Sequence, residues 1–208
     1  FEGGITLIQV KNVTKKYGSF KAIDDISFEV KDGEVVGFLG PNGAGKSTTM
    51  NMITGYIDPT QGQIIVNGID VGKRPRRAKK QIGYMPEAVP LYQELTVKEF
   101  VRYMAELKLV KHKDIKAEVN KVLEEVGLKD VENKLIRNLS RGYKQRVGIA
   151  GALIGNPDVI ILDEPTVGLD PKQITEIRDL IKKLRKNHTV ILSSHVLSEV
   201  SQICEKVI

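Results

Sequence analysis

Four things are scarce or missing in this sequence of 208 residues: cysteine, tryptophan, aromatic side chains in general and long apolar runs. Cys204 is the only cysteine, so no disulfide can form within the chain, and we expect a reducing compartment. Aromatic residues make up 5% of the chain, which leaves few platforms for stacking the bases of single-stranded nucleic acid. No apolar run approaches the roughly 18 residues that a membrane-spanning helix needs.

Hydrophobic residues and positive charge are plentiful. Hydrophobic residues make up 41% of the chain, which is enough for one well-filled core with an attached subdomain. The net charge of +6 suits anionic partners, whether nucleotide, nucleic acid or lipid surface, and selects none of them. We interpret the basic run KRPRRAKK, residues 73–80, as a solvated loop and helix start, with anionic lipid or a partner protein as the alternative.

The hydrophobic pattern changes twice along the chain. Residues 5–39 predict strands separated by turns, and EVVGFL at 34–39 is apolar enough for a strand buried on both faces. Residues 88–156 carry apolar residues at helical spacing, which predicts a mainly helical insert. The last third alternates strands with a helix, in the order DVIILD, DPKQITEIRDLIKKLRK and TVILSS. Such alternation predicts a parallel, wound sheet.

Capping residues indicate where the predicted helices begin. Thr96, with Glu99 three residues later, forms a capping-box pattern. Asp114 is the predicted N-cap of a second helix that ends at Gly127. Asp170, followed by a proline at the first helical position, predicts a third helix start.

The glycine-rich stretch GPNGAGKST follows the buried strand and matches the pattern G-x-x-x-x-G-K-S/T at Gly40, Gly45, Lys46 and Ser47. Glycines let the backbone curl so that successive N–H groups point at phosphate oxygens, and the next helix adds its positive end. Lys46 supplies a point cation for the outer phosphates, and the Ser47 hydroxyl can bind Mg²⁺. The predicted nucleotide-binding residues of this loop are Asn42, Gly43, Ala44, Gly45, Lys46, Ser47 and Thr48.

Two adjacent carboxylates end the apolar strand VIIL. Asp163 and Glu164 lie at the carboxyl end of that strand, which is the edge where wound sheets bind ligands. Because neighbours on a strand point opposite ways, we expect the two carboxylates to have different roles. Asp163 is expected to hold Mg²⁺, often through water, and Glu164 to take a proton from an attacking water.

Four further segments make the chain resemble an ATP-binding cassette, the nucleotide-hydrolysing subunit of ABC transporters. NLSRGYKQRVGIAGAL resembles the family signature LSGGQ and its helix, and VGLD, ending at Asp170, resembles the D-loop. SSH, ending at His195, resembles the switch-histidine segment. KKYGSFKAIDDISF resembles the N-terminal segment whose aromatic residue, here Tyr17, stacks on adenine. The order and spacing match along nearly the whole chain.

The resemblance implies a P-loop NTPase fold of the α/β class. It implies one ABC ATPase domain over residues 1–208. Residues 1–87 and 157–208 would form a RecA-like parallel core sheet with a small antiparallel β subdomain. Residues 88–156 would form an inserted helical subdomain that carries the signature.

The resemblance also implies roles at the site. Lys46, Glu164 and His195 are expected to be catalytic, with His195 contacting the γ-phosphate. Ser140 is a good N-cap for the signature helix, and Gly142 permits close backbone approach, so the start of this helix is a second anion site. The resemblance implies that two cassettes pair head to tail around two ATP, so that each signature closes on the γ-phosphate bound by its partner.

The chain departs from the family pattern in two places. Glu87 stands where the Q-loop usually has glutamine, and we hypothesise that it can bind metal or water and keeps the coupling role at the join with the helical insert. Arg141 and Tyr143 stand where the common signature has Gly and Gln, which adds bulk beside Gly142. Similar features recur in cassettes of prokaryotic drug- and natural-export systems, so the resemblance favours export over solute import.

The implied function is ATP hydrolysis with magnesium that drives separate transmembrane permease subunits, in a homodimer or heterodimer with a second cassette. Its implied place is the cytoplasmic face of the membrane, held peripherally by the permease. The alternative is a soluble ABC-type ATPase acting on nucleic acid or ribosomes. The short spacing between phosphate loop and signature and the single cassette disfavour that alternative. A P-loop kinase would leave the signature unexplained, and the intact Glu164 disfavours a non-catalytic cassette.

Overall fold

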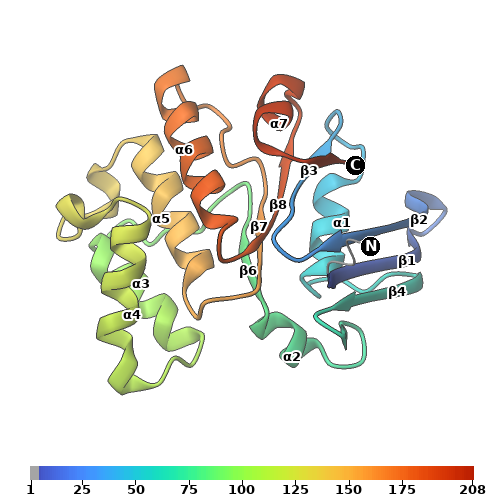
Figure 1. The fold of residues 1–208 in the computed structure, drawn as a ribbon, viewed down its shortest axis with the longest axis horizontal. Coiled ribbons are helices and arrows are strands. Elements are labelled where there is room, and N and C mark those ends of the chain that lie inside the picture. Colours follow the sequence, from blue (N-terminus) through green and yellow to red (C-terminus); the bar gives the residue numbers. More distant parts are fainter. Residues whose placement is uncertain (1–4) are drawn as a thin grey trace.

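A computed structural model of the protein describes residues 5–208, so the first four residues of the predicted core lie outside it (Figure 1). Its strands are β1 Thr6–Tyr17, β2 Phe20–Lys31, β3 Val35–Leu39, β4 Gln61–Val66, β5 Ile69–Asp70, β6 Ile82–Met85, β7 Val159–Leu162, β8 Thr189–Ser194 and β9 Lys206–Val207. Its α-helices are α1 Lys46–Ile53, α2 Pro75–Lys80, α3 Val97–Leu107, α4 His112–Glu125, α5 Arg141–Leu153, α6 Pro171–Leu184 and α7 Leu197–Ile203. Two 3₁₀ turns, Lys129–Val131 and Ile136–Asn138, precede α5. Within the described range, no helix is both long and apolar enough to cross a bilayer.

The first sheet is antiparallel, with the strand order β2-β1-β4-β5. β1 and β2 form a hairpin in which Tyr17 pairs with Phe20 across the turn. The buried face of this sheet, which includes Ile8 and Val10, shares one hydrophobic cluster with Met50 of α1. The small sheet therefore lies beside α1, on the right of Figure 1.

The second sheet is parallel, with the strand order β6-β7-β8-β3-β9. Every residue of β7 and β8 is buried, because helices cover both faces. In β7, Ile160 and Leu162 pack with the cluster that contains α5 and α6, whereas Val159 and Ile161 pack with the cluster that contains α1. The predicted α/β fold, with a parallel core sheet and a small antiparallel sheet, is confirmed.

The segment between β6 and β7 is helical, and its helices α3, α4 and α5 pack on one another (Figure 1). The capping box of Thr96 and Glu99 is confirmed, as is the N-cap role of Asp170. The predicted N-cap role of Asp114 is wrong, because α4 begins at His112 and its N-cap is Lys111. The boundaries 88 and 156 of a helical subdomain remain a prediction.

The C-terminal end of α5 is anchored to the core by two close contacts. The Nζ atom of Lys108 donates hydrogen bonds of 2.8 Å to the carbonyl oxygens of both Ala152 and Ile154. A Cβ at Gly83 of β6 would lie only 2.1 Å from the oxygen of Ala152, so strand and helix are in backbone contact. Burial lowers the pKa of Lys108 to about 8, and the nearby charge of Glu118 opposes this shift.

Candidate functional site

The glycine-rich loop between β3 and α1 lines a pocket of about 420 Å³. Gly43 and Gly45 have φ angles of 85° and 93°, in the left-handed region that favours glycine. At Gly45, an added Cβ would lie 2.4 Å from the Ile23 side chain, so the loop packs directly against β2. Among residues 5–208, no side chain caps the N-terminus of α1, which leaves the N–H groups of its first turn for an anion.

Lys46 lies between this loop and the acidic end of β7. Its Nζ atom donates hydrogen bonds of 2.6 Å to the carbonyl oxygen of Gly40 and 3.2 Å to that of Pro41. The same Nζ lies 3.8 Å from Oε1 of Glu164, and both side chains are largely buried. Oε1 of Glu164 is a buried oxygen without a hydrogen-bond partner among residues 5–208. The site therefore contains a carboxylate oxygen that can still accept a proton or a hydrogen bond.

The two carboxylates after β7 are held by β8. The Oγ atom of Ser193 donates a 2.5 Å hydrogen bond to Oδ1 of Asp163 and accepts a 2.8 Å hydrogen bond from the backbone N–H of Glu164. Glu164 has a φ of 48°, a left-handed conformation that non-glycine residues rarely adopt and that is concentrated at functional sites. Nδ1 of His195 lies 3.0 Å from Oε2 of Glu164. Ser193 of β8 thus holds the backbone of Glu164, and His195, directly after β8, contacts its carboxylate.

An aromatic pair forms the outer wall of the pocket. Tyr17 and Phe20, on either side of the β1–β2 turn, are 52% and 66% exposed and both line the pocket. The Nζ atom of Lys15 lies 5.2 Å from the centre of the Tyr17 ring. Phe20 is not among the residues predicted from the sequence, although its position three residues after Tyr17, across a short turn, was a usable signal.

Most of the residues predicted for one nucleotide meet in this pocket. The predicted residues that line it are Tyr17, Asn42, Gly43, Gly45, Lys46, Ser47, Thr48, Glu87 and Glu164. Ala44 is not among the lining residues, and its N–H donates a 3.2 Å hydrogen bond to the carbonyl oxygen of Pro41. Asp163 and His195 do not line the pocket: Asp163 is buried beside Glu164 in the chain, and His195 contacts the lining residue Glu164.

Ser140 and Gly142 do not join that pocket in the same chain. They line a separate pocket of about 420 Å³, together with Asp170 and Gln173. Ser140 is exposed and is the N-cap of α5, where its Oγ accepts a 3.4 Å hydrogen bond from the N–H of Tyr143. At Gly142, an added Cβ would lie 2.9 Å from the Gln173 side chain, so α5 and α6 approach closely here.

The glycine-rich loop and the start of α5 therefore line two separate pockets of the same chain. A profile of the ABC transporter family matches residues 23–167 of this chain. The chain belongs to the ABC transporter family. Within the family, it is 44% identical over 204 residues to the bacitracin transport ATP-binding protein BcrA of Bacillus licheniformis, an alignment that covers 97% of this chain and 66% of the relative.

A second relative and a solved structure agree with this assignment. The linearmycin resistance ATP-binding protein LnrL of Bacillus subtilis (strain 168) is 39% identical over 202 residues, which cover 97% of this chain and 65% of the relative. The chain thus spans slightly less than two thirds of the length of these relatives. A dimeric ATP-binding cassette in a post-hydrolysis state, bound to ADP and Pi, has a TM-score of 0.85 and 30% identity, covering 97% of this chain and 93% of that one.

Arg141, one of the two residues by which this ABC cassette departs from the common signature, packs against the D-loop. An added Cβ at Gly168, whose φ is 65°, would lie 2.4 Å from the guanidinium of Arg141, so this side chain lies directly over the D-loop backbone. Gln145, one turn into α5, is buried, and its Nε2 donates a 2.9 Å hydrogen bond to the carbonyl oxygen of Pro165. The signature helix is thereby connected to the loop that follows Glu164.

Proposed function

We propose that this cassette binds ATP together with magnesium in the pocket between the phosphate loop and the end of β7, and that it hydrolyses the ATP. The observation that carries this proposal is the buried Oε1 of Glu164, which has no hydrogen-bond partner within residues 5–208 and faces Nζ of Lys46 at 3.8 Å. A buried carboxylate with a free oxygen beside a phosphate loop suits a group that accepts a proton from an attacking water.

The remaining residues of the pocket would position the nucleotide. The backbone N–H groups at the start of α1 and the ammonium of Lys46 would bind the phosphates. The exposed rings of Tyr17 and Phe20 offer apolar faces for the adenine base. His195 would hold the Glu164 carboxylate in its present orientation through the contact at Nδ1.

The donors at the site fit a magnesium ion that shares its ligands with phosphate. Residues 5–208 contain no cluster of three or more His, Cys, Asp or Glu side chains that could hold a metal alone. Mg²⁺ bound with a nucleotide needs only one or two protein groups, because phosphate oxygens and water complete its octahedron. Ser47 and Glu87 line the pocket, Asp163 is buried next to the lining residue Glu164, and these three are the residues that would hold the ion. The ion would neutralise charge that develops on the phosphates.

The second pocket, at Ser140 and Gly142, supports pairing with another cassette. Because this pocket is separate from the phosphate loop of the same chain, we propose that it closes on the nucleotide of a partner copy. The solved relative that is a dimer bound to ADP and Pi supports this arrangement. We further propose a separate membrane permease as partner, peripheral membrane association at the cytoplasmic face, and export, which the relatives named for bacitracin transport and linearmycin resistance support.

Glu164→Gln in the full-length protein tests the proposal. The amide keeps the size of the side chain but cannot take a proton, so we expect ATP binding to persist while the hydrolysis rate falls about 10²- to 10⁴-fold. ATP-bound dimers should accumulate, which size-exclusion chromatography with light scattering would detect. Glu94→Gln, at an exposed carboxylate that pairs with Arg137, is the matched control and should hydrolyse ATP normally. A Glu164→Gln protein with the wild-type rate would exclude Glu164 as the base.

A further inference from the structure

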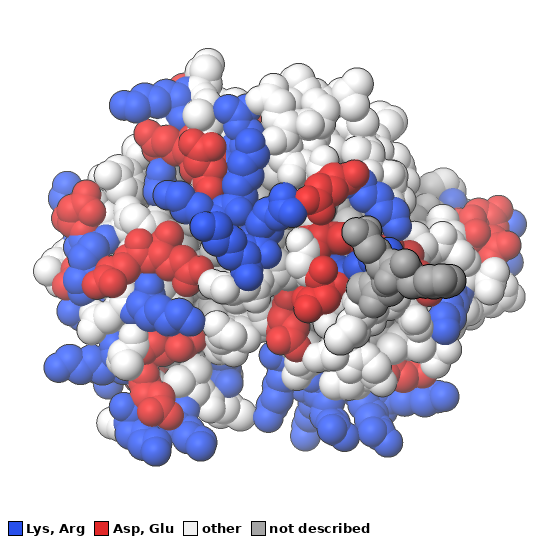
Figure 2. Space-filling model, in the orientation of Figure 1, with Lys and Arg blue, Asp and Glu red and all other residues white. Residues whose placement is uncertain are grey.

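The basic run that begins at Lys73 forms an exposed, positively charged surface on and just before α2. Each of its six cationic residues is exposed, and the run contains no acidic residue. Figure 2 shows these blue side chains at the lower edge of the molecule, below the position of α2 in Figure 1. Five of the six take part in no ion pair within residues 5–208, namely Arg74, Arg76, Arg77, Lys79 and Lys80.

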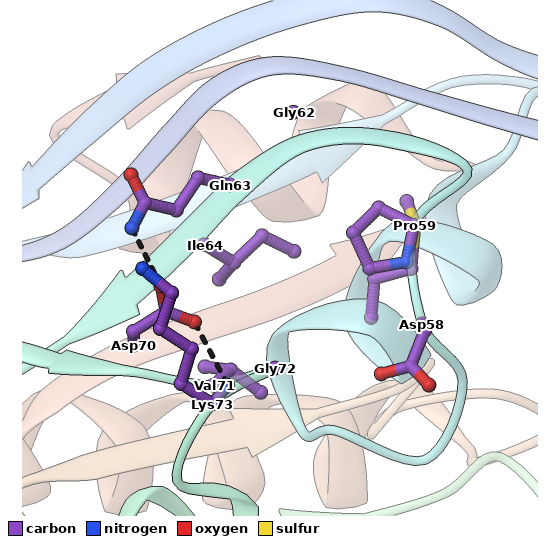
Figure 3. Close-up of a pocket in the computed structure, with 10 residues that line it drawn as sticks. Asp58, Pro59, Gly62, Gln63, Ile64, Asp70, Val71, Gly72 and Lys73 are labelled. Carbon is purple, nitrogen blue, oxygen red and sulfur yellow. Dashed lines mark hydrogen bonds and ion pairs between the residues drawn. The ribbon is translucent and has the colours of Figure 1, made fainter.

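The carboxylate beside this surface is already engaged. Asp70 accepts a 2.6 Å hydrogen bond from Nε2 of Gln63 and a 3.1 Å hydrogen bond from the N–H of Lys73, and it lies 3.6 Å from the Lys73 ammonium (Figure 3). The hydrogen bond from Gln63 is the largest cause that lowers the pKa of Asp70. Asp70 therefore fixes the start of the run, and the cations that follow Lys73 have no carboxylate partner in the described part of the chain.

Apolar side chains lie on the same edge. A groove of about 530 Å³ is lined on one side by Arg76, Lys79 and Lys80 of α2 and on the other by Leu107 and Leu109 at the end of α3. The two leucines are 57% and 79% exposed. Leu109 also has a φ of 58°, an uncommon conformation for this residue, so the turn holds a large apolar side chain in solvent at the cost of backbone strain.

We propose that this basic edge, formed by residues 73–80 and the leucines at 107 and 109, binds directly to an anionic lipid surface. Lys and Arg side chains would contact the headgroups, and the two leucines would enter the apolar boundary beneath them. Charge complementarity alone would also suit nucleic acid, but exposed leucines gain nothing from a phosphate backbone, and the groove has no aromatic residue to stack on bases. This lipid contact would exist in addition to any contact with a permease. It would keep the basic edge of the cassette against the membrane surface.

Sedimentation with lipid vesicles tests the inference without nucleotide or permease, so its outcome is independent of the proposed ATPase. The protein is mixed with vesicles of equal parts phosphatidylglycerol and phosphatidylcholine, and with vesicles of phosphatidylcholine alone. We expect binding to the anionic vesicles that falls with added salt. Each cation near such a surface contributes about a fivefold change in partitioning, so Arg76→Gln/Lys79→Gln/Lys80→Gln should weaken binding about 100-fold.

Two further variants separate a specific edge from a general effect of charge. Lys182→Gln/Lys183→Gln/Lys186→Gln removes the same charge from exposed positions at the end of α6 and should bind almost as well as wild type. Leu107→Asn/Leu109→Asn keeps all charges and should lose the binding that remains at high salt. The proposal would be overturned if the triple variant in α2 and the triple variant at the end of α6 lost equal amounts of vesicle binding. Equal binding to both kinds of vesicle would also overturn it, as would binding to duplex nucleic acid but not to anionic vesicles.

Discussion

Replacing Lys108 by methionine should change how the stability of this cassette responds to pH. The Lys108 ammonium is largely buried and binds the last carbonyls of α5, the helix whose first residues form the signature pocket. Burial lowers its pKa from 10.5 to about 8 in the folded protein. At about 1.4 kcal/mol for each pKa unit, this fall corresponds to at most about 3.5 kcal/mol.

The sign of the effect follows from the direction of the shift. Between pH 8 and pH 10.5, the unfolded chain holds a proton on Lys108 that the folded protein has released. The wild type therefore gains stability from this group as pH rises from about 8 to 10.5, and loses that gain as pH falls back to about 8, below which both states are protonated and the contribution stays constant. Methionine does not titrate, so the stability of wild type minus that of Lys108→Met should rise by up to about 3 kcal/mol between pH 7 and pH 10.5.

Urea unfolding at a series of pH values measures this difference. With an m-value of about 2 kcal/mol per molar urea, the unfolding midpoint of wild type relative to the variant should move by up to about 1.5 M. Other groups that titrate in this range are common to both proteins and cancel in the comparison. Lys113→Met, at an exposed position in α4, is the control and should show no such pH dependence. A stability difference between wild type and Lys108→Met that stays constant or falls with rising pH would show that burial does not lower the pKa of Lys108.

Three further substitutions test contacts around the site. Ser193→Ala leaves Asp163 and the Glu164 N–H without a partner and should cost about 1–3 kcal/mol in urea unfolding, with a slower ATPase. Gly83→Ala forces a Cβ against the backbone of α5 and should cost at least about 1–3 kcal/mol, whereas an unchanged unfolding midpoint would contradict the backbone contact. Glu87→Gln should alter the stimulation of ATPase by the permease more than basal ATP affinity, and the coupling role fails if both match wild type.

Two of these substitutions have matched controls. Ser198→Ala, at an exposed position on α7, should leave both stability and ATPase rate near wild type. Gly72→Ala places its Cβ 3.6 Å from Oδ1 of Asp70, an ordinary contact, and should be tolerated where Gly83→Ala is not.

Capping residues predicted a helix start correctly where the residue suits the N-cap and does not lie inside the first turn of the helix. Thr96 with Glu99, and Asp170 before a proline, cap the helices for which they were predicted. Asp114 failed because an aspartate is stabilised in the first turn of a helix as well as at its cap. The true N-cap, Lys111, makes no side-chain capping hydrogen bond, so nothing in its chemistry marked the boundary.

The parts of the site that sequence reasoning missed depend on pairing between strands. The P-loop residues are contiguous, and their spacing alone indicates phosphate chemistry. Ser193 reaches Asp163 only because Leu162 pairs with Leu192 in the parallel sheet, a register that single-sequence reasoning does not supply. Phe20 likewise lies beside Tyr17 through the register of the β1–β2 hairpin.

The central prediction is that the loop from Gly40 to Ser47 binds the triphosphate and that a second copy of the cassette closes over it. A crystal structure of the Glu164→Gln protein grown with ATP and magnesium tests this directly. We expect the triphosphate against Lys46 and the loop N–H groups, with Ser140 and Gly142 from a second copy on its far side. A structure in which the nucleotide binds elsewhere, or in which Ser140 is turned into its own subunit, would contradict the account.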